Sequence, residues 1–115
     1  MATKNELKDG MTHAERALHD YRCADDKMDD VQKHLGAKGL LKKAILACEK
    51  WRLSTTLHTP QIVLYLSCEA RKLFTVNVTN RFMGLLRKNS TVTFVKFIIV
   101  KENGKLESEP TQGFE

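Results

Sequence analysis

The clearest periodic pattern lies near the N-terminus, where apolar residues recur at alternating intervals of three and four positions from residue 14 to residue 35. This spacing is typical of a helix that packs along another helix. Thr12 and Glu15 form a capping-box signature at its start, and Gly36 is a typical helix terminator. We therefore expect one continuous helix over residues 12–36. Its seam comprises Ala14, Ala17, Tyr21, Ala24, Met28, Val31 and Leu35.

The partner of this seam is either a helix of the same chain or the same helix of a second subunit. Several seam positions are Ala, which lets two helices approach closely but buries little apolar area. A helix that projects from a small domain often serves dimerisation, so we favour a homodimer through this arm. The preceding residues 1–11 are polar and are expected to be disordered.

The next apolar stripe is broader than a seam and predicts a core helix from Lys38 to about Leu53. Thr59 followed by Pro60 is a helix-start signal, since a capping hydroxyl precedes a residue that suits the first helical position. The apolar run "QIVLYLS", residues 61–67, is expected to continue that helix.

A β-hairpin is predicted near the C-terminus. Residues 91–100 are rich in β-branched and aromatic side chains, and the Asn103-Gly104 dipeptide favours a tight turn. Residues 106–109 would form the returning strand, and residues 110–115 are expected to be a flexible tail.

The stretch "FTVNVTNRFMGLLRKNSTVTF", residues 74–94, has two interpretations. The alternation of Phe74, Val76 and Val78 with polar residues indicates a short strand. Alternatively, Ser67 caps a short helix through Leu73, residues 74–76 form a turn, and a second helix covers residues 77–88 with Asn77 as its cap. In the second interpretation, Val78, Phe82, Leu85 and Leu86 share an inward face.

A core helix, a short helix, a polar-faced helix and a basic hairpin, in this order, resemble the winged helix-turn-helix superfamily. "EARKLFTVNVTNRFMGLLRKNSTV" is similar to the superfamily's pattern of Ala in the first helix, a V-N-V-T-N-R entry and Leu-x-Lys before a return strand. "TPQIVLYL" is similar to the opening of the preceding helix in the MarR-like branch. The resemblance covers roughly residues 38–109.

This resemblance implies a fold that is mainly α with a small β-hairpin, an α+β winged helix-turn-helix over residues 37–109 with an N-terminal helical dimerisation arm. It also implies that the second helix enters the major groove of DNA and that the hairpin touches the backbone or the minor groove. The residues assigned to DNA contact are Thr79, Asn80, Arg81, Met83, Gly84, Arg87 and Lys88 on the helix, with Lys101, Asn103 and Lys105 on the hairpin.

The charge distribution supports a polyanionic partner. The chain carries a net charge of +5, but residues 38–105 alone hold 13 Lys or Arg against 3 Asp or Glu, a net +10. Residues 1–37 have a net charge of −2, and the last ten residues hold acids without a base. A basic segment of this size favours nucleic acid, because binding releases the counter-ions condensed on the phosphates.

Candidate chemistry beyond binding is sparse. Cys23, Cys48 and Cys68 are odd in number and widely spaced, as suits a reducing cytoplasm. The run "DDKMDD", residues 25–30, is an exposed acidic face rather than a metal or acid–base site. We expect no enzyme activity, catalytic residue, cofactor or metal, and no membrane span. The sequence leaves open whether there is a small-molecule effector.

The leading hypothesis is therefore a sequence-specific DNA-binding protein, a small dimeric transcriptional regulator that is cytoplasmic or nucleoid-associated. The alternative is a non-enzymatic α+β interaction module, with a short sheet that includes residues 74–79, whose basic surface binds an acidic protein or RNA.

Overall fold

Two adjacent apolar strands, β2 (Gln61–Leu66) and β3 (Phe94–Val100), form the centre of the molecule. The computed structural model describes residues 12–55 and 60–113. The described sheet has the order β1-β2-β3-β4, with β5 also paired to β3. The outer strands are β1 (Lys50–Ser54), β4 (Leu106–Ser108) and β5 (Gln112–Gly113). The helices are α2 (His13–Cys23), α3 (Met28–Leu35), α4 (Gly39–Leu46), α5 (Cys68–Leu73) and α6 (Val76–Asn89).

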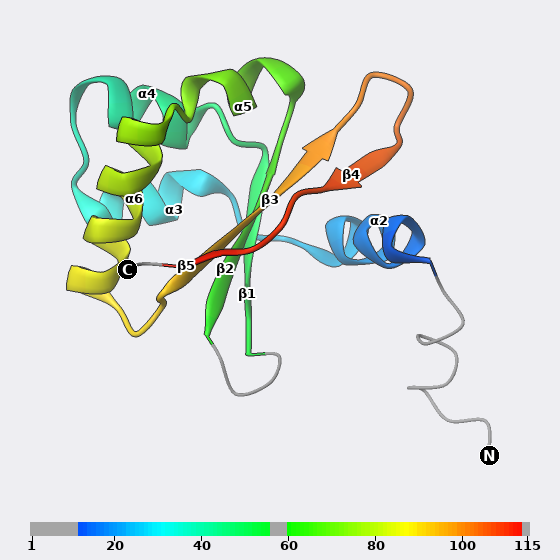
Figure 1. Ribbon diagram of the computed structural model, residues 1–115, viewed down its shortest axis with the longest axis horizontal. Coiled ribbons are helices and arrows are strands. Elements are labelled where there is room, and N and C mark those ends of the chain that lie inside the picture. Colours follow the sequence, from blue (N-terminus) through cyan, green and yellow to red (C-terminus); the bar gives the residue numbers. More distant parts are fainter. Residues whose placement is uncertain (1–11, 56–59, 114–115) are drawn as a thin grey trace.

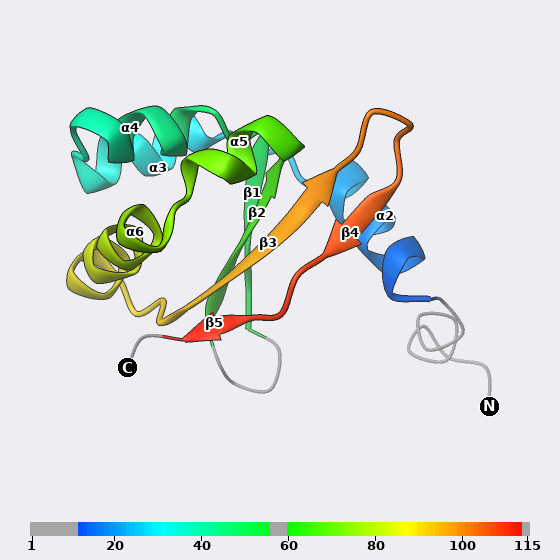
Figure 2. The same ribbon diagram turned by 45° about the horizontal axis from the view of Figure 1, so that its top comes forward.

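The sheet is mixed. β1 and β2 form an antiparallel hairpin in which Trp51 pairs with Leu64. β2 then runs parallel to β3, with Leu64 opposite Phe97, and α5 and α6 form the crossover between them. β4 and β5 are both antiparallel to β3. Helices α3 to α6 lie on one side of the sheet and α2 lies on the other (Figures 1 and 2).

Each face of β2 contributes to a separate core. Ile62, Leu64 and Leu66 pack with α3 to α6 in the larger cluster, whereas Val63 and Tyr65 pack against α2 in the smaller one. Both faces are buried, so β2 is a continuous apolar run rather than an alternating one. This is the physical reason why the prediction of a helix over "QIVLYLS" is wrong.

The arm expected over residues 12–36 is two helices rather than one. Its capping box is confirmed, because Glu15 N–H donates to Thr12 Oγ1 and Thr12 N–H donates to Glu15 Oε1. Gly36 ends α3 in the left-handed region with φ 64°, also as predicted. The chain leaves the helix at Ala24, which is extended with φ −83° and ψ 115°, and α3 starts only at Met28. This break lets α2 and α3 pack on opposite faces of the sheet.

The core helix predicted from Lys38 to Leu53 is also shorter than expected. α4 ends at Leu46, and β1 begins at Lys50. Trp51 Nε1 donates to Lys27 O over 2.8 Å, and Trp51 N–H donates to Asp26 O over 3.2 Å. These contacts hold the second half of the predicted helix in an extended conformation beside the linker between α2 and α3.

In the stretch with two interpretations, the helical one is correct and the strand over residues 74–79 is wrong. α5 is capped by Ser67, whose Oγ accepts from Ala70 N–H, as predicted. Thr75 rather than Asn77 caps α6, with Thr75 Oγ1 accepting from Val78 N–H. The hairpin of β3 and β4 is confirmed, and Gln112–Gly113, expected in a flexible tail, pairs with β3. The α+β class is confirmed, with a larger sheet than the predicted hairpin.

Candidate nucleic-acid interface

Helix α6 is amphipathic, and its outer face is the centre of the candidate interface. Val78, Phe82 and Leu86 point into the core. The opposite stripe is polar and basic, and Gly84 in its middle is half-buried. The exposed residues of this stripe are Asn77, Asn80, Arg81, Arg87 and Lys88. Asn and Arg side chains make paired hydrogen bonds to base edges, and Lys contacts phosphates.

Two residues that were predicted to contact DNA from this helix are buried. Thr79 is 4% exposed and Met83 is 8% exposed. Thr79 Oγ1 donates to Phe74 O over 3.3 Å, so its hydroxyl stabilises the turn between α5 and α6. Helices α3 and α4 both contact α6, which widens its inward face beyond the stripe expected from sequence. The expectation that Thr79 and Met83 are exposed is therefore wrong.

Helices α4 and α5 extend the basic surface next to α6. α4 contacts both α5 and α6, and the three helices carry a single acidic residue in their sequences, Glu69. We call their outer surface, together with the cap of α4, the basic helical face. Its exposed basic residues are Lys38, Lys42, Lys43, Lys72, Arg81, Arg87 and Lys88.

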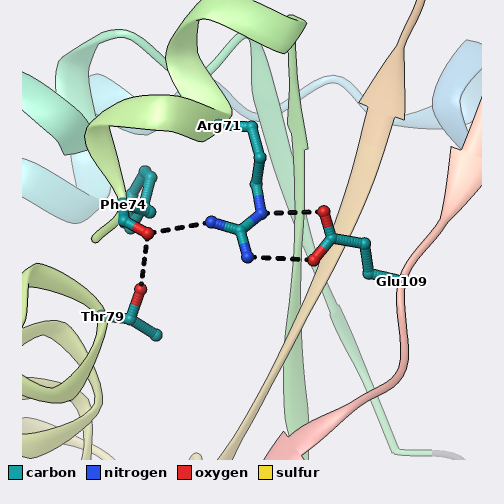
Figure 3. A network of polar contacts seen from close by, with 4 residues as sticks. All are labelled: Arg71, Phe74, Thr79 and Glu109. Atoms are coloured by element: carbon teal, nitrogen blue, oxygen red, sulfur yellow. Dashed lines mark hydrogen bonds and ion pairs between the residues drawn. The ribbon is translucent and has the colours of Figure 1, made fainter. Parts of the chain in front are cut away.

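Arg71 also lies on α5, but its side chain points towards Glu109 and the Phe74 carbonyl (Figure 3). Its Nε and Nη2 donate to the two carboxylate oxygens of Glu109 over 2.8 and 3.0 Å, and its Nη1 donates to Phe74 O over 2.9 Å. The guanidinium carbon also lies 4.4 Å from the centre of the Phe97 ring. Arg71 thus joins the α5–α6 turn to the segment between β4 and β5, and its role is structural.

The hairpin residues assigned to DNA contact lie far from α6. Both views show the β3–β4 turn at the opposite end of the molecule, beside α2 (Figures 1 and 2). Lys101 Nζ forms an ion pair with Glu107 at 2.6 Å, and the hydrogen bond to that carboxylate raises the pKa of Lys101. Asn103 Oδ1 accepts from Lys105 N–H, which shapes the turn. The structure therefore does not place Lys101, Asn103 and Lys105 on one surface with the helix.

The residues assigned to dimerisation are mostly used within the chain. Ala17 and Ala24 belong to the smaller core, between α2 and the sheet. Met28, Val31 and Leu35 belong to the larger core. Tyr21 is half-buried. Its ring packs against Tyr65 in a tilted arrangement with ring centres 5.2 Å apart, and its hydroxyl donates to Glu49 Oε2 over 2.7 Å. Ala14 is exposed. Most of the seam is therefore buried against the sheet and the other helices of the same chain, and dimerisation stays a prediction.

Sequence reasoning did not assign Lys38, Lys42, Lys43 or Lys72 to the interface. The signal was present, because the net charge of residues 38–105 far exceeds what α6 alone supplies. What the sequence lacks is the adjacency of α4, α5 and α6, which depends on the crossover between β2 and β3.

Other kinds of site find little support in the described part of the chain. Over residues 12–55 and 60–113, no group of three or more His, Cys, Asp or Glu side chains is arranged to hold a metal ion. None of the described helices combines the length and apolar content needed to cross a bilayer. Comparison with models of protein families, with curated proteins and with solved structures finds no match to this chain.

Proposed function

We propose that the protein binds duplex DNA through the basic helical face. The observation that carries this proposal is the separation of charge over adjacent helices. α4, α5 and α6 carry six exposed Lys or Arg side chains against one acid, Glu69. α2 and α3 carry four acids, Glu15, Asp20, Asp29 and Asp30, against three bases, Arg16, Arg22 and Lys33. A predominantly positive surface attracts a polyanion, and the release of counter-ions from the polyanion favours binding.

The chemistry of the α6 stripe favours DNA over a generic acidic partner. Asn80 and Arg81 lie side by side in the first half of α6 and are both exposed. These residue types form two-pronged hydrogen bonds with adenine and guanine edges in the major groove. Gly84 lies one turn further along α6 and has no side chain, so its position leaves room for DNA to approach the helix backbone closely. A role as a sequence-specific transcriptional regulator rests on these contacts and stays a prediction.

Fluorescence anisotropy with a labelled random-sequence duplex, measured between about 50 and about 200 mM salt, tests this proposal. We expect affinity to fall steeply with salt, and the log–log slope to decrease by about one for each phosphate-binding side chain that a mutation removes. Arg81→Glu should weaken binding strongly without changing the melting temperature, because the side chain is exposed.

Lys105→Glu is the matched control, because it makes the same change of charge on the β3–β4 hairpin, away from α6 (Figure 1). If both variants lose the same affinity, binding follows net charge and the basic helical face is not the site. Binding that is absent at low salt would overturn the proposal. Tighter binding of the matching RNA would replace DNA with the RNA alternative.

A further inference from the structure

A small apolar pocket opens between α3, the C-terminal end of α6 and the hairpin of β1 and β2. Its volume is about 220 Å³, and most of its lining residues are apolar, with Asp30, His34 and Ser90 as the polar ones. Trp51 and Leu53 of β1 form one wall, Val31 and Leu35 of α3 form another, and Leu86 of α6 contributes to the lining. A pocket of this kind is suited to one bulky apolar side chain.

The strand that lines this pocket is at the edge of the described sheet. Within residues 12–55 and 60–113, β2 is the only strand paired with β1. The outer edge of β1 is occupied at Trp51, whose N–H donates to Asp26 O. In an antiparallel pair the backbone groups of alternate residues point the same way. The N–H and C=O of Leu53 therefore point outward, away from β2.

The side chain of Leu53 strengthens the case that this edge is a binding surface. It is 58% exposed and also contributes to the lining of the pocket, so it lies at the pocket rim. Backbone groups that point outward and an apolar pocket beside them are the two elements of strand addition. In that mode, main-chain hydrogen bonds supply affinity and a pocket for alternate side chains supplies specificity.

The charge around the edge defines the partner. The linker between α2 and α3 and the first turn of α3 carry Asp25, Asp26, Asp29 and Asp30, all exposed. Lys27 is the one base among them, and Asp30 also lines the pocket. Asp29 is paired with Lys33 on the same helix. The two bases of β1 lie on the α2 side of the sheet, where Lys50 lies over the Tyr21 ring and Arg52 pairs with Asp20. The end of α6 forms a basic rim with Arg87 and Lys88. A partner strand beside β1 therefore meets negative charge on the α3 side, which selects positively charged residues.

We propose that the edge of β1 binds an extended basic peptide segment by strand addition, with one bulky apolar side chain in the pocket. The acidic run of residues 25–30 lies beside this edge and is not part of the basic helical face. The partner is a different macromolecule from DNA, and the proposal stands independently of the proposed function.

An acetylated and amidated peptide of sequence KVKFKVK is a suitable probe, titrated into the full chain and followed by amide NMR shifts. We expect shifts confined to β1, α3, the linker before α3 and the remaining pocket residues Ile62, Leu86, Ser90 and Val92. Leu53→Pro removes the outward N–H but leaves the pairing with β2, because Pro is tolerated on an edge strand whose N–H faces solvent. It should weaken binding by about tenfold or more, because it removes one backbone hydrogen bond and also the Leu53 side chain from the pocket wall.

Leu53→Ala removes the side chain alone and should weaken binding less than Leu53→Pro. Leu40→Ala is its matched control, because Leu40 is also an exposed leucine, 69% accessible, but lies on α4 outside the pocket. This variant should bind the peptide like the wild type. Asp26→Lys combined with Asp30→Lys should weaken binding, and replacing every Lys of the peptide with Glu should abolish it. No binding at millimolar peptide, equal binding of the Glu peptide, or shifts on α4 to α6 instead of β1 would each overturn the proposal. Self-association through β1 at the same concentration would assign the edge to a second copy of the chain and overturn it as well.

Discussion

The three cysteines differ in their surroundings, and at the residue scale this difference determines their reactivity. Cys48 is buried behind α4, and its Sγ lies 3.6 Å from Ala44 O as a weak donor. Burial raises the pKa of the Cys48 thiol from 9.0 to about 12. Cys23 and Cys68 are exposed. The reactive form of cysteine is the thiolate, so Cys48 should be inert in the folded state.

We predict that a chromogenic disulfide reagent at mildly alkaline pH modifies Cys23 and Cys68 quickly and Cys48 only after denaturation. The raised pKa keeps Cys48 protonated in the fold while the unfolded thiol ionises. The contribution of this group to stability is therefore present below about pH 9 and declines towards pH 12. Counting modified thiols with and without denaturant tests this prediction. Cys48→Ala should remove the thiol that reacts only after denaturation. Three thiols that react at one rate in the native protein would contradict it.

At the element scale, the features that the sequence predicted correctly are those set by local chemistry. The capping box of Thr12 and Glu15, the Ser67 cap and the Asn103-Gly104 turn depend on neighbours within a few residues, and all are present. The errors arise where tertiary contacts override the pattern. β2 has the composition of a buried helix because both of its faces are covered.

Part of the candidate site was also predictable from local sequence, namely the residues on the outer face of α6. The outward positions of Asn80, Arg81, Arg87 and Lys88 follow from helical periodicity alone, and the structure shows them exposed. Thr79 and Met83 lie at the margins of that periodicity, where α3 and α4 decide which side is covered. Their burial could not be predicted without knowing how the helices pack.

The contact between Arg71 and Glu109 provides the element-scale prediction. Both side chains are 27% exposed, and the guanidinium makes two hydrogen bonds to the carboxylate. Hydrogen bonds to charged groups contribute about 1.5–3 kcal/mol each when well shielded and less with exposure. We expect a double-mutant cycle of Arg71→Ala and Glu109→Ala to give a coupling of about 1–2 kcal/mol in the free energy of unfolding.

Urea denaturation of the four proteins in the cycle provides the measurement. Arg71→Lys should recover little of the stability, because an ammonium group cannot bond both carboxylate oxygens and the Phe74 carbonyl in the same planar geometry. The pair Lys33 and Asp29, a more exposed contact with N–O distance 3.7 Å, is the control and should show a coupling near zero. Equal couplings for the two pairs would mean that Arg71 does not join the α5–α6 turn to the C-terminal segment.

At the scale of the whole molecule, the N-terminal segment packs against both faces of the sheet. α2 packs on one face and α3 on the other, and the linker between them passes the edge of β1. On the α2 side, Arg52 Nη2 forms an ion pair with Asp20 at 2.8 Å, and Arg52 Nε donates to the hydroxyl of Tyr65. The segment expected to project as an arm is thus part of the domain core.

Substitutions at buried and exposed positions of residues 12–36 distinguish a seam that packs within the chain from one that joins two subunits. Met28 is 2% exposed in the larger core, whereas Ala14 of the same pattern is exposed. Met28→Ala should lower the free energy of unfolding by about 2–5 kcal/mol. Met28→Asp should unfold the protein, because it also buries a charge without a partner. Ala14→Asp should change stability by at most about 0.5 kcal/mol. Circular dichroism during urea denaturation, with light scattering on the same samples, measures folding and mass together. If residues 12–36 instead join two subunits, Met28→Asp would give a folded monomer, and that result would return the seam to an intersubunit role.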